Sequence, residues 1–224
     1  MQKLFFLTIF SLLSASAFAQ QFTKKEDSDP KAKAVLEAMR QQVEGYNSLQ
    51  ADFTLKIEYP EQPVSTETGT LLQQGDKYRL NLSGRTIVSD GESVWLYLEK
   101  NKEVQINNAE EDGEGGTINS PKDLFRAYEW DNYIYVLVNE FSENGRVIQQ
   151  IEFKPLDRDS DFSKIRLTVD KKTLQIVRIK SFSKDGSRFT LIVDKLKPNA
   201  AVTDSTFIFT KKECPDCHFE DLRI

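Results

Sequence analysis

The stretch LQADFTLKIEY, residues 49–59, alternates apolar and polar side chains over its whole length. A period of two indicates a β-strand with one buried face and one solvated face. The stretch therefore predicts a long strand in an amphipathic sheet. The apolar and aromatic members of the alternation are Leu49, Ala51, Phe53, Leu55, Ile57 and Tyr59.

Much of the remaining chain repeats this pattern. Similar runs lie at residues 77–82, 93–100, 103–107, 133–141, 146–153, 164–170, 173–182 and 188–196, with a short one at 205–209. Turn residues such as Asn144-Gly145 and Asp185-Gly186 separate several neighbours, and links this short join antiparallel strands. Such a meander is too long to stay flat. We therefore predict a mainly β (α+β) fold, an incomplete and strongly curved antiparallel β-barrel of about ten to eleven strands.

Two segments have helical periodicity instead. In the first, Asp29 can cap the helix and Pro30 suits its first position. Its apolar stripe consists of Ala32, Val35, Leu36, Met39, Val43 and Tyr46. The second, SPKDLFRAY at residues 120–128, carries Leu124, Phe125 and Tyr128 on one face. Because amphipathic helices bury their apolar face, we expect both to cover the concave side of the sheet.

The N-terminus resembles a secretory signal. Lys3 precedes an apolar run at residues 4–13, and Ala17-Phe18-Ala19 is a small-x-small cleavage site. The apolar run is too short to span a bilayer, so we predict a signal peptide at residues 1–19 and one domain at residues 20–224. This predicts an exported protein, located in a bacterial periplasm.

Charge and motif content exclude several functions. With 35 acidic and 30 basic residues, the formal net charge is −5, which argues against nucleic acid and anionic membrane surfaces as main partners. The sequence has no Gly-x-Ser-x-Gly motif, no phosphate-binding loop and a single histidine, His218. We therefore expect no enzymatic activity and no cofactor.

The C-terminal Cys214-Pro215-Asp216-Cys217-His218 leaves three functional interpretations open beside a structural one. It has the spacing of a c-type haem attachment site, and its Cys-x-x-Cys part is also that of a redox dithiol or half a zinc site. In an oxidising compartment, two cysteines this close most simply form a disulfide, and we favour a Cys214–Cys217 disulfide that stiffens a turn.

The segment TIVSDGESVWLYLEK, residues 86–100, resembles the signature hairpin of the periplasmic outer-membrane lipoprotein carriers, the LolA family. The resemblance continues in order along the chain. It includes SLQADFTLKI (48–57), Gly69 followed by KYRL (77–80), SPKDLF (120–125), FKPLD (153–157), FSKIRLTVDKKTLQI (162–176), STFIF (205–209) and FEDLR (219–223).

The resemblance implies a carrier without enzymatic activity, whose helices form a lid over an apolar cavity. Such proteins receive acylated lipoproteins from an inner-membrane ABC transporter and deliver them to an outer-membrane acceptor. A sixteen-carbon chain costs about 12 kcal/mol to expose to water, at ~0.8 kcal/mol per CH₂, so a carrier must hide it. We expect a monomer that does this. The alternatives are a lipid- or partner-sensing domain of the same fold and a c-type haem electron carrier that uses Cys214, Cys217 and His218.

Candidate lipid-binding residues follow from the strand alternation and the helix stripes. They are Leu36, Met39, Val43, Phe53, Leu55, Tyr78, Leu80, Trp95, Tyr97, Leu124, Phe125, Ile165, Leu167, Phe189 and Leu191. The chain departs from the family at one place, where an Arg-Pro pair usually supplies an arginine that ties the lid shut. Gln74 or Gly75 stands there, and the lid role is not transferred to the later Arg79.

Overall fold

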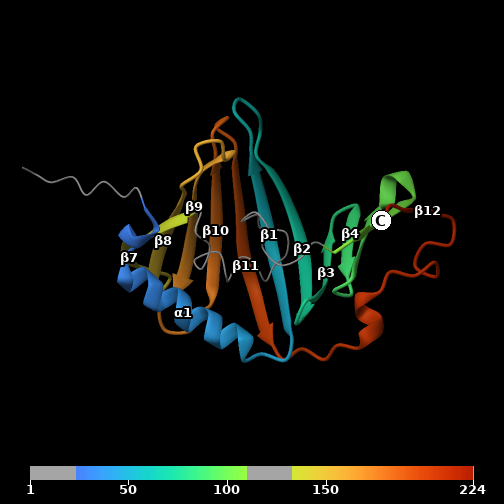
Figure 1. Ribbon diagram of the computed structural model, residues 1–224, viewed down its shortest axis with the longest axis horizontal. Coiled ribbons are helices and arrows are strands. Elements are labelled where there is room, and N and C mark those ends of the chain that lie inside the picture. Colours follow the sequence, from blue (N-terminus) through green and yellow to red (C-terminus); the bar gives the residue numbers. More distant parts are fainter. Residues whose placement is uncertain (1–23, 110–132, 224) are drawn as a thin grey trace, which may run out of the picture.

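The computed structural model describes residues 24–109 and 133–223, and these form one curved, 12-stranded sheet (Figure 1). The strands are β1 (Leu49–Glu58), β2 (Ser65–Gln74), β3 (Lys77–Leu82), β4 (Arg85–Ser89), β5 (Ser93–Leu98), β6 (Glu103–Asn108), β7 (Tyr133–Glu143), β8 (Arg146–Pro155), β9 (Phe162–Asp170), β10 (Ile176–Ser183), β11 (Arg188–Pro198) and β12 (His218–Asp221). The described helices are α1 (Pro30–Glu44) and the 3-10 helices η1 (Lys25–Asp27), η2 (Glu99–Asn101) and η5 (Asp204–Phe207).

The sheet consists of two meanders that join at their long strands. Its order is β12-β6-β5-β4-β3-β2-β1-β11-β10-β9-β8-β7, so the first meander meets the second where β1 pairs with β11. The edges β12 and β7 are not hydrogen-bonded to each other, and the sheet is therefore open. The register with β1 shifts by one residue at Asp194, which makes a bulge in β11 opposite Asp52 and Phe53. A bulge bends its strand and increases the local twist.

Helix α1 runs across the strands and is fixed to the β7 edge at its N-terminus (Figure 1). Asp29 Oδ1 accepts a hydrogen bond from the Lys31 backbone N–H at 2.8 Å, which caps the helix. Asp29 Oδ2 accepts from the Leu137 N–H at 3.2 Å, and the Asp29 N–H donates to the Tyr135 carbonyl at 2.9 Å. One residue thus caps α1 and satisfies part of an exposed strand edge. None of the described helices is long and apolar enough to cross a membrane.

The C-terminal segment crosses the face of the sheet opposite α1. Phe207 and Phe209 are buried there, and Cys214 and Cys217 are joined in a disulfide against the same cluster. The segment then adds β12 to the β6 edge in parallel orientation. The expectation of antiparallel pairing throughout is wrong at this one strand pair, because the chain reaches β6 by a long crossover and not by a hairpin.

Most predicted elements are confirmed. Nine of the ten predicted strands are present, and α1 begins at Pro30 after the Asp29 cap, as predicted. The strand predicted at 205–209 is wrong, because most of it is the 3-10 helix η5. Its alternating Phe207 and Phe209 anchor a crossing segment without pairing to a neighbouring strand. The predicted signal peptide at 1–19 and the predicted helix at 120–128, with Leu124 and Phe125, lie outside the described residues.

Candidate functional site

One face of the sheet carries rows of apolar side chains, and we call it the apolar face. The longest row crosses six strands in register, from β1 to β7. Its members are Leu55, Leu191, Ile179, Leu167, Ile151 and Leu137. Because side chains alternate between faces, pairing in register places all six on one surface.

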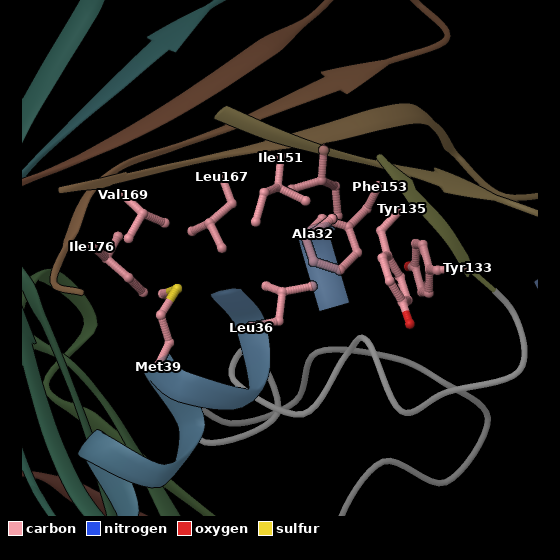
Figure 2. Packing of buried hydrophobic residues seen from close by; sticks show 11 residues of the cluster. Ala32, Leu36, Met39, Tyr133, Tyr135, Ile151, Phe153, Leu167, Val169 and Ile176 are labelled. Atoms are coloured by element: carbon pink, nitrogen blue, oxygen red, sulfur yellow. The ribbon is translucent and has the colours of Figure 1, made fainter. Parts of the chain in front are cut away.

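Helix α1 packs on one half of the apolar face. Figure 2 shows Leu36 and Met39 beneath the side chains of Leu167, Val169 and Ile176. Leu36 is 5% exposed and Met39 is 2% exposed. Burying side chains of this size stabilises a fold by about 1.5–3 kcal/mol each, so this cluster holds α1 on β7–β10. The remaining members of the cluster are Ala32, Tyr133, Tyr135, Ile151, Phe153 and Ile165.

The other half of the apolar face continues across β1 to β5. Ala51 pairs in register with Leu71, and the row continues through Leu80, Ile87 and Leu96. The four larger side chains of this row are only half-buried, and none of them belongs to the cluster under α1. This half therefore presents apolar side chains that the described helix does not cover.

A charged pair lies beside this half. Arg85 of β4 and Glu67 of β2 form an ion pair at 3.3 Å, and both belong to the apolar face by register. Arg85 lies by register in the row that starts from Phe53 and Gly69. Glu67 lies on the same face of β2, two residues before Gly69. Both side chains are partly exposed, so the pair marks a polar rim of the apolar face.

The model of the outer membrane lipoprotein carrier protein LolA matches residues 44–210. The chain belongs to the LolA family. No functionally curated protein matches the sequence significantly.

Solved structures of similar shape include three that cover most of this chain. An uncharacterized conserved protein from Thermus thermophilus has a TM-score of 0.57 and 12% identity, over 87% of this chain and 99% of its own. A LolA superfamily protein from Nitrosomonas europaea has a TM-score of 0.42 and 15% identity, over 80% of this chain and 97% of its own. The Mycobacterium tuberculosis lipoprotein LppX has a TM-score of 0.48 and 11% identity, over 79% of this chain and 99% of its own. The similarity to the Thermus thermophilus protein shows the fold and nothing about function.

The structure brings most of the candidate residues together. Leu36 and Met39 project from α1 into its cluster with the sheet, and Val43 is half-buried near the C-terminal end of the helix. The sheet candidates that lie on the apolar face by register are Phe53, Leu55, Tyr78, Leu80, Ile165, Leu167, Phe189 and Leu191. Leu71, Ile87, Leu96 and Ile179 share this face but were not among the candidates. Strand alternation could have identified Ile179, which lies between Arg178 and Lys180.

Trp95 and Tyr97 require a correction, because they lie on the opposite face. Trp95 pairs with Val88, and both side chains are buried with Phe209 under the C-terminal segment. Tyr97 packs on Phe209 with ring centroids 5.1 Å apart. β5 is apolar on both faces, so its sequence could not decide which set joins the apolar face. Register places Val94, Leu96 and Leu98 there instead.

Arg79 also acts away from the apolar face. Its guanidinium donates to the Thr206 carbonyl at 3.2 Å and forms an ion pair with Glu213. Arg79 therefore attaches β3 to the C-terminal segment. This agrees with the decision not to give Arg79 the role of the family's lid arginine.

The disulfide bears on the haem alternative. Both sulfur atoms of Cys214 and Cys217 are used in their mutual bond, which leaves no thiol for a thioether link to haem. Among the described residues, no group of three or more His, Cys, Asp or Glu side chains is placed to hold a metal ion.

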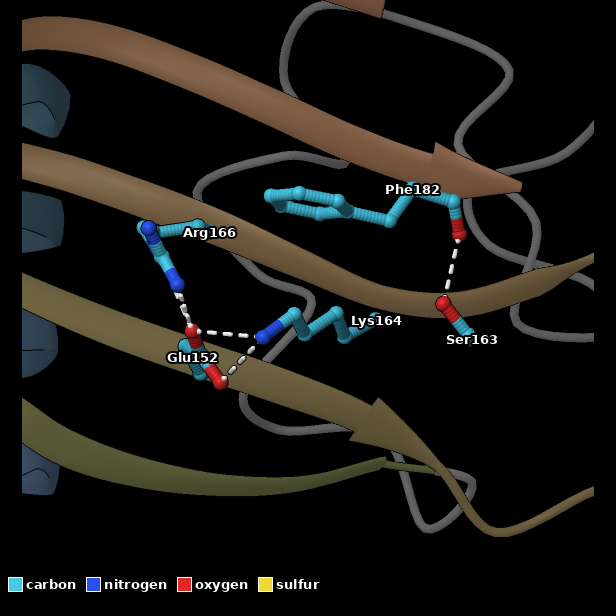
Figure 3. A network of polar contacts seen from close by, with 5 residues as sticks. All are labelled: Glu152, Ser163, Lys164, Arg166 and Phe182. Carbon is cyan, nitrogen blue, oxygen red and sulfur yellow. Dashed lines mark hydrogen bonds and ion pairs between the residues drawn. The ribbon is translucent and has the colours of Figure 1, made fainter. Parts of the chain in front are cut away.

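The face opposite α1 is polar over β1 and β8–β11, and we call this region the polar face. Figure 3 shows Glu152 of β8 accepting hydrogen bonds from Lys164 and Arg166 of β9. Lys164 Nζ lies 3.0 Å from Glu152 Oε1, and Arg166 Nε lies 2.8 Å from the same oxygen. Burial raises the pKa of Glu152, but the hydrogen bonds from Arg166 and Lys164 outweigh it, so this pKa is lower than usual.

Proposed function

We propose that the protein is a periplasmic carrier that binds the acyl chains of lipoproteins on its apolar face. The observation that supports this best is the row Leu71, Leu80, Ile87 and Leu96, which is apolar, in register and only half-buried. Side chains of a finished core are normally buried much more completely. An acyl chain laid along this row would complete their burial.

Energetics favour such a use. Each CH₂ group removed from water contributes about 0.8 kcal/mol, so even half of a sixteen-carbon chain would contribute about 6 kcal/mol. Carriers must also release their cargo. An open sheet whose described helix packs on one half allows an acyl chain to enter and leave the other half without unfolding the cluster under α1.

Family membership and the N-terminal sequence support the proposed partners and location. LolA family membership supports cargo transfer between an inner-membrane lipoprotein-releasing ABC transporter and an outer-membrane acceptor. Residues 1–19 support export through a cleaved signal peptide. In this role the protein acts as a chaperone for acylated lipoproteins, works without catalysis and is a monomer.

Native mass spectrometry of protein purified from the envelope of its own host tests this function. A carrier should co-purify in part with an intact acylated protein, whose mass would add to that of the chain. A free lipid bound in its place would favour the sensing domain, and a chain that is always empty would oppose both. Replacement of Leu80 by Asp should remove the bound mass, whereas replacement of the exposed Thr70 on the opposite face should not.

A further inference from the structure

A cavity of about 680 Å³ lies on the polar face, separate from the apolar face. Its lining comes from every strand between β2 and β7 in the sheet order. A volume of this size falls within the range of small-ligand sites. Acyl-chain binding makes no use of this cavity, because its lining is rich in charged side chains.

The charges around the cavity are mainly positive. Lys56, Arg166, Arg178 and Lys180 line it, against two carboxylates, Glu58 and Glu143. Lys164 and Arg188 extend the positive region beside it, where Glu152 is the additional carboxylate. These six basic side chains face three acidic ones in a chain whose net charge is −5. The polar face is therefore a basic patch on an acidic protein.

The cations converge on one aromatic ring. The centroid of the Phe182 ring lies 5.0 Å from Lys164 Nζ, 5.5 Å from Arg166 Cζ, 5.6 Å from Lys180 Nζ and 5.9 Å from Arg188 Cζ. One ring face attracts a cation, but four cations beside one ring repel one another. Such an arrangement favours a bound anion that relieves the repulsion.

Among the described residues, the three carboxylates form ion pairs with four of the six basic side chains and leave the other two without an ion pair. Glu58 pairs with Lys180 at 3.0 Å, Glu143 pairs with Arg178 at 2.9 Å, and Glu152 holds Lys164 and Arg166. Within residues 24–109 and 133–223, neither Lys56 nor Arg188 makes a hydrogen bond or ion pair through its side chain. These two side chains are exposed and free to meet an external anion.

The rim of the cavity adds exposed apolar groups. Val64, which precedes β2 and lines the cavity, is 56% exposed, and Tyr59 at the start of the same hairpin is 45% exposed. The β1–β2 hairpin projects beyond the neighbouring strands at the end away from α1 (Figure 1). Basic side chains beside exposed aromatic and aliphatic groups are typical of proteins that bind the surface of a membrane.

We propose that the polar face docks on membranes by binding the phosphate groups of anionic phospholipids, with Lys56 and Arg188 as the main free cations. The overall charge would keep the protein away from such membranes in other orientations. Docking through this face leaves the apolar face unobstructed. The proposal goes beyond acyl-chain binding and does not depend on it.

Sedimentation of purified protein with vesicles tests this docking. At low salt, the protein should bind vesicles that contain phosphatidylglycerol at least tenfold more tightly than vesicles of phosphatidylcholine alone, and salt should weaken the binding. The double variant Lys56→Gln/Arg188→Gln should bind at least tenfold more weakly, since each basic side chain contributes about fivefold. The control Lys100→Gln/Lys212→Gln, which removes two exposed lysines elsewhere, should bind like the wild type.

Three results would overturn the proposal. One is equal binding by the two double variants, and another is equal binding to both kinds of vesicle. The third is tight binding of an acidic peptide together with no binding of anionic vesicles, which would assign the face to a protein partner. Leu80→Asp, on the apolar face, separates the two proposals, because it should abolish lipoprotein binding and leave vesicle docking unchanged.

Discussion

The ring of Phe53 on β1 lies directly over Gly69 of β2, its partner in register. A Cβ atom on Gly69 would be 2.4 Å from Phe53 Cζ and 2.7 Å from the backbone oxygen of Asn81. Only glycine leaves room for the ring at this point of the apolar face. The pair joins the two halves of this face, since β1 and β2 lie between the strands under α1 and β3–β5.

Replacement of Gly69 by Ala should therefore destabilise the protein by about 1–3 kcal/mol, measured by urea unfolding. In a Phe53→Leu background, Gly69→Ala should still destabilise the protein, but by less than in the wild type. The shorter side chain removes the clash with the ring, whereas the contact with Asn81 is to the backbone and remains. The control Thr68→Ala, exposed on the same strand, should stay within about 0.5 kcal/mol of the wild type. A Gly69→Ala protein as stable as the wild type would show that the sheet adjusts at no cost.

Asp29 should be the residue that attaches α1 to the sheet edge. Asp29→Ala removes acceptors for the Lys31 and Leu137 N–H groups, so we expect a loss of about 1–2 kcal/mol and faster hydrogen exchange in the first turn of α1. Asp29→Ser, which keeps one cap acceptor, should lose less. Unchanged exchange in α1 of Asp29→Ala would contradict this role.

The disulfide should stabilise the C-terminal crossing. A bond between residues three apart closes a small loop, for which chain entropy predicts about 2 kcal/mol. Cys214→Ser/Cys217→Ser should therefore unfold at lower urea concentration than the oxidised wild type. Reducing agent should shift the wild type to the same midpoint and leave the variant unchanged. Equal midpoints under all conditions would rule out a structural contribution.

Glu152 should make stability depend on pH in the acid range. Its pKa in the folded protein is lowered, so its ionised form is favoured by folding. The stabilisation is fully present above the unfolded-state pKa, near 4.5, and disappears as the pH falls through the lower folded-state value. Wild type should exceed Glu152→Gln in stability at pH 7, and the difference should shrink on acidification. A difference independent of pH would oppose this assignment.

The sequence predicted the elements whose pattern is local. β1 has one clear period of two, and α1 has an Asp29-Pro30 start and a single stripe, so both were predicted close to their observed bounds. β2 was missed because Leu71 and Leu72 interrupt its alternation. β12 is four residues long and charged, and it owes its place to the crossing segment before it.

The candidate site was predictable only up to the choice of face. Leu80 and Leu55 could be assigned because their strands have one polar side, whereas Trp95 and Leu96 are both apolar neighbours on β5. What decides between them is the C-terminal segment, which lies more than a hundred residues later and buries Trp95. Likewise, the charge balance of the whole chain conceals the basic patch, because pairing in register gathers Lys164, Lys180 and Arg188 on one surface.

Photocrosslinking in cells tests whether lipoprotein acyl chains bind on the apolar face. A photoreactive phenylalanine analogue at Leu80 on the apolar face is compared with one at Thr70, which is exposed on the opposite face and pairs in register with the next residue, Asn81. We expect adducts with acylated lipoproteins from position 80 and none from position 70. Adducts of equal yield from both positions, or none from position 80, would contradict it.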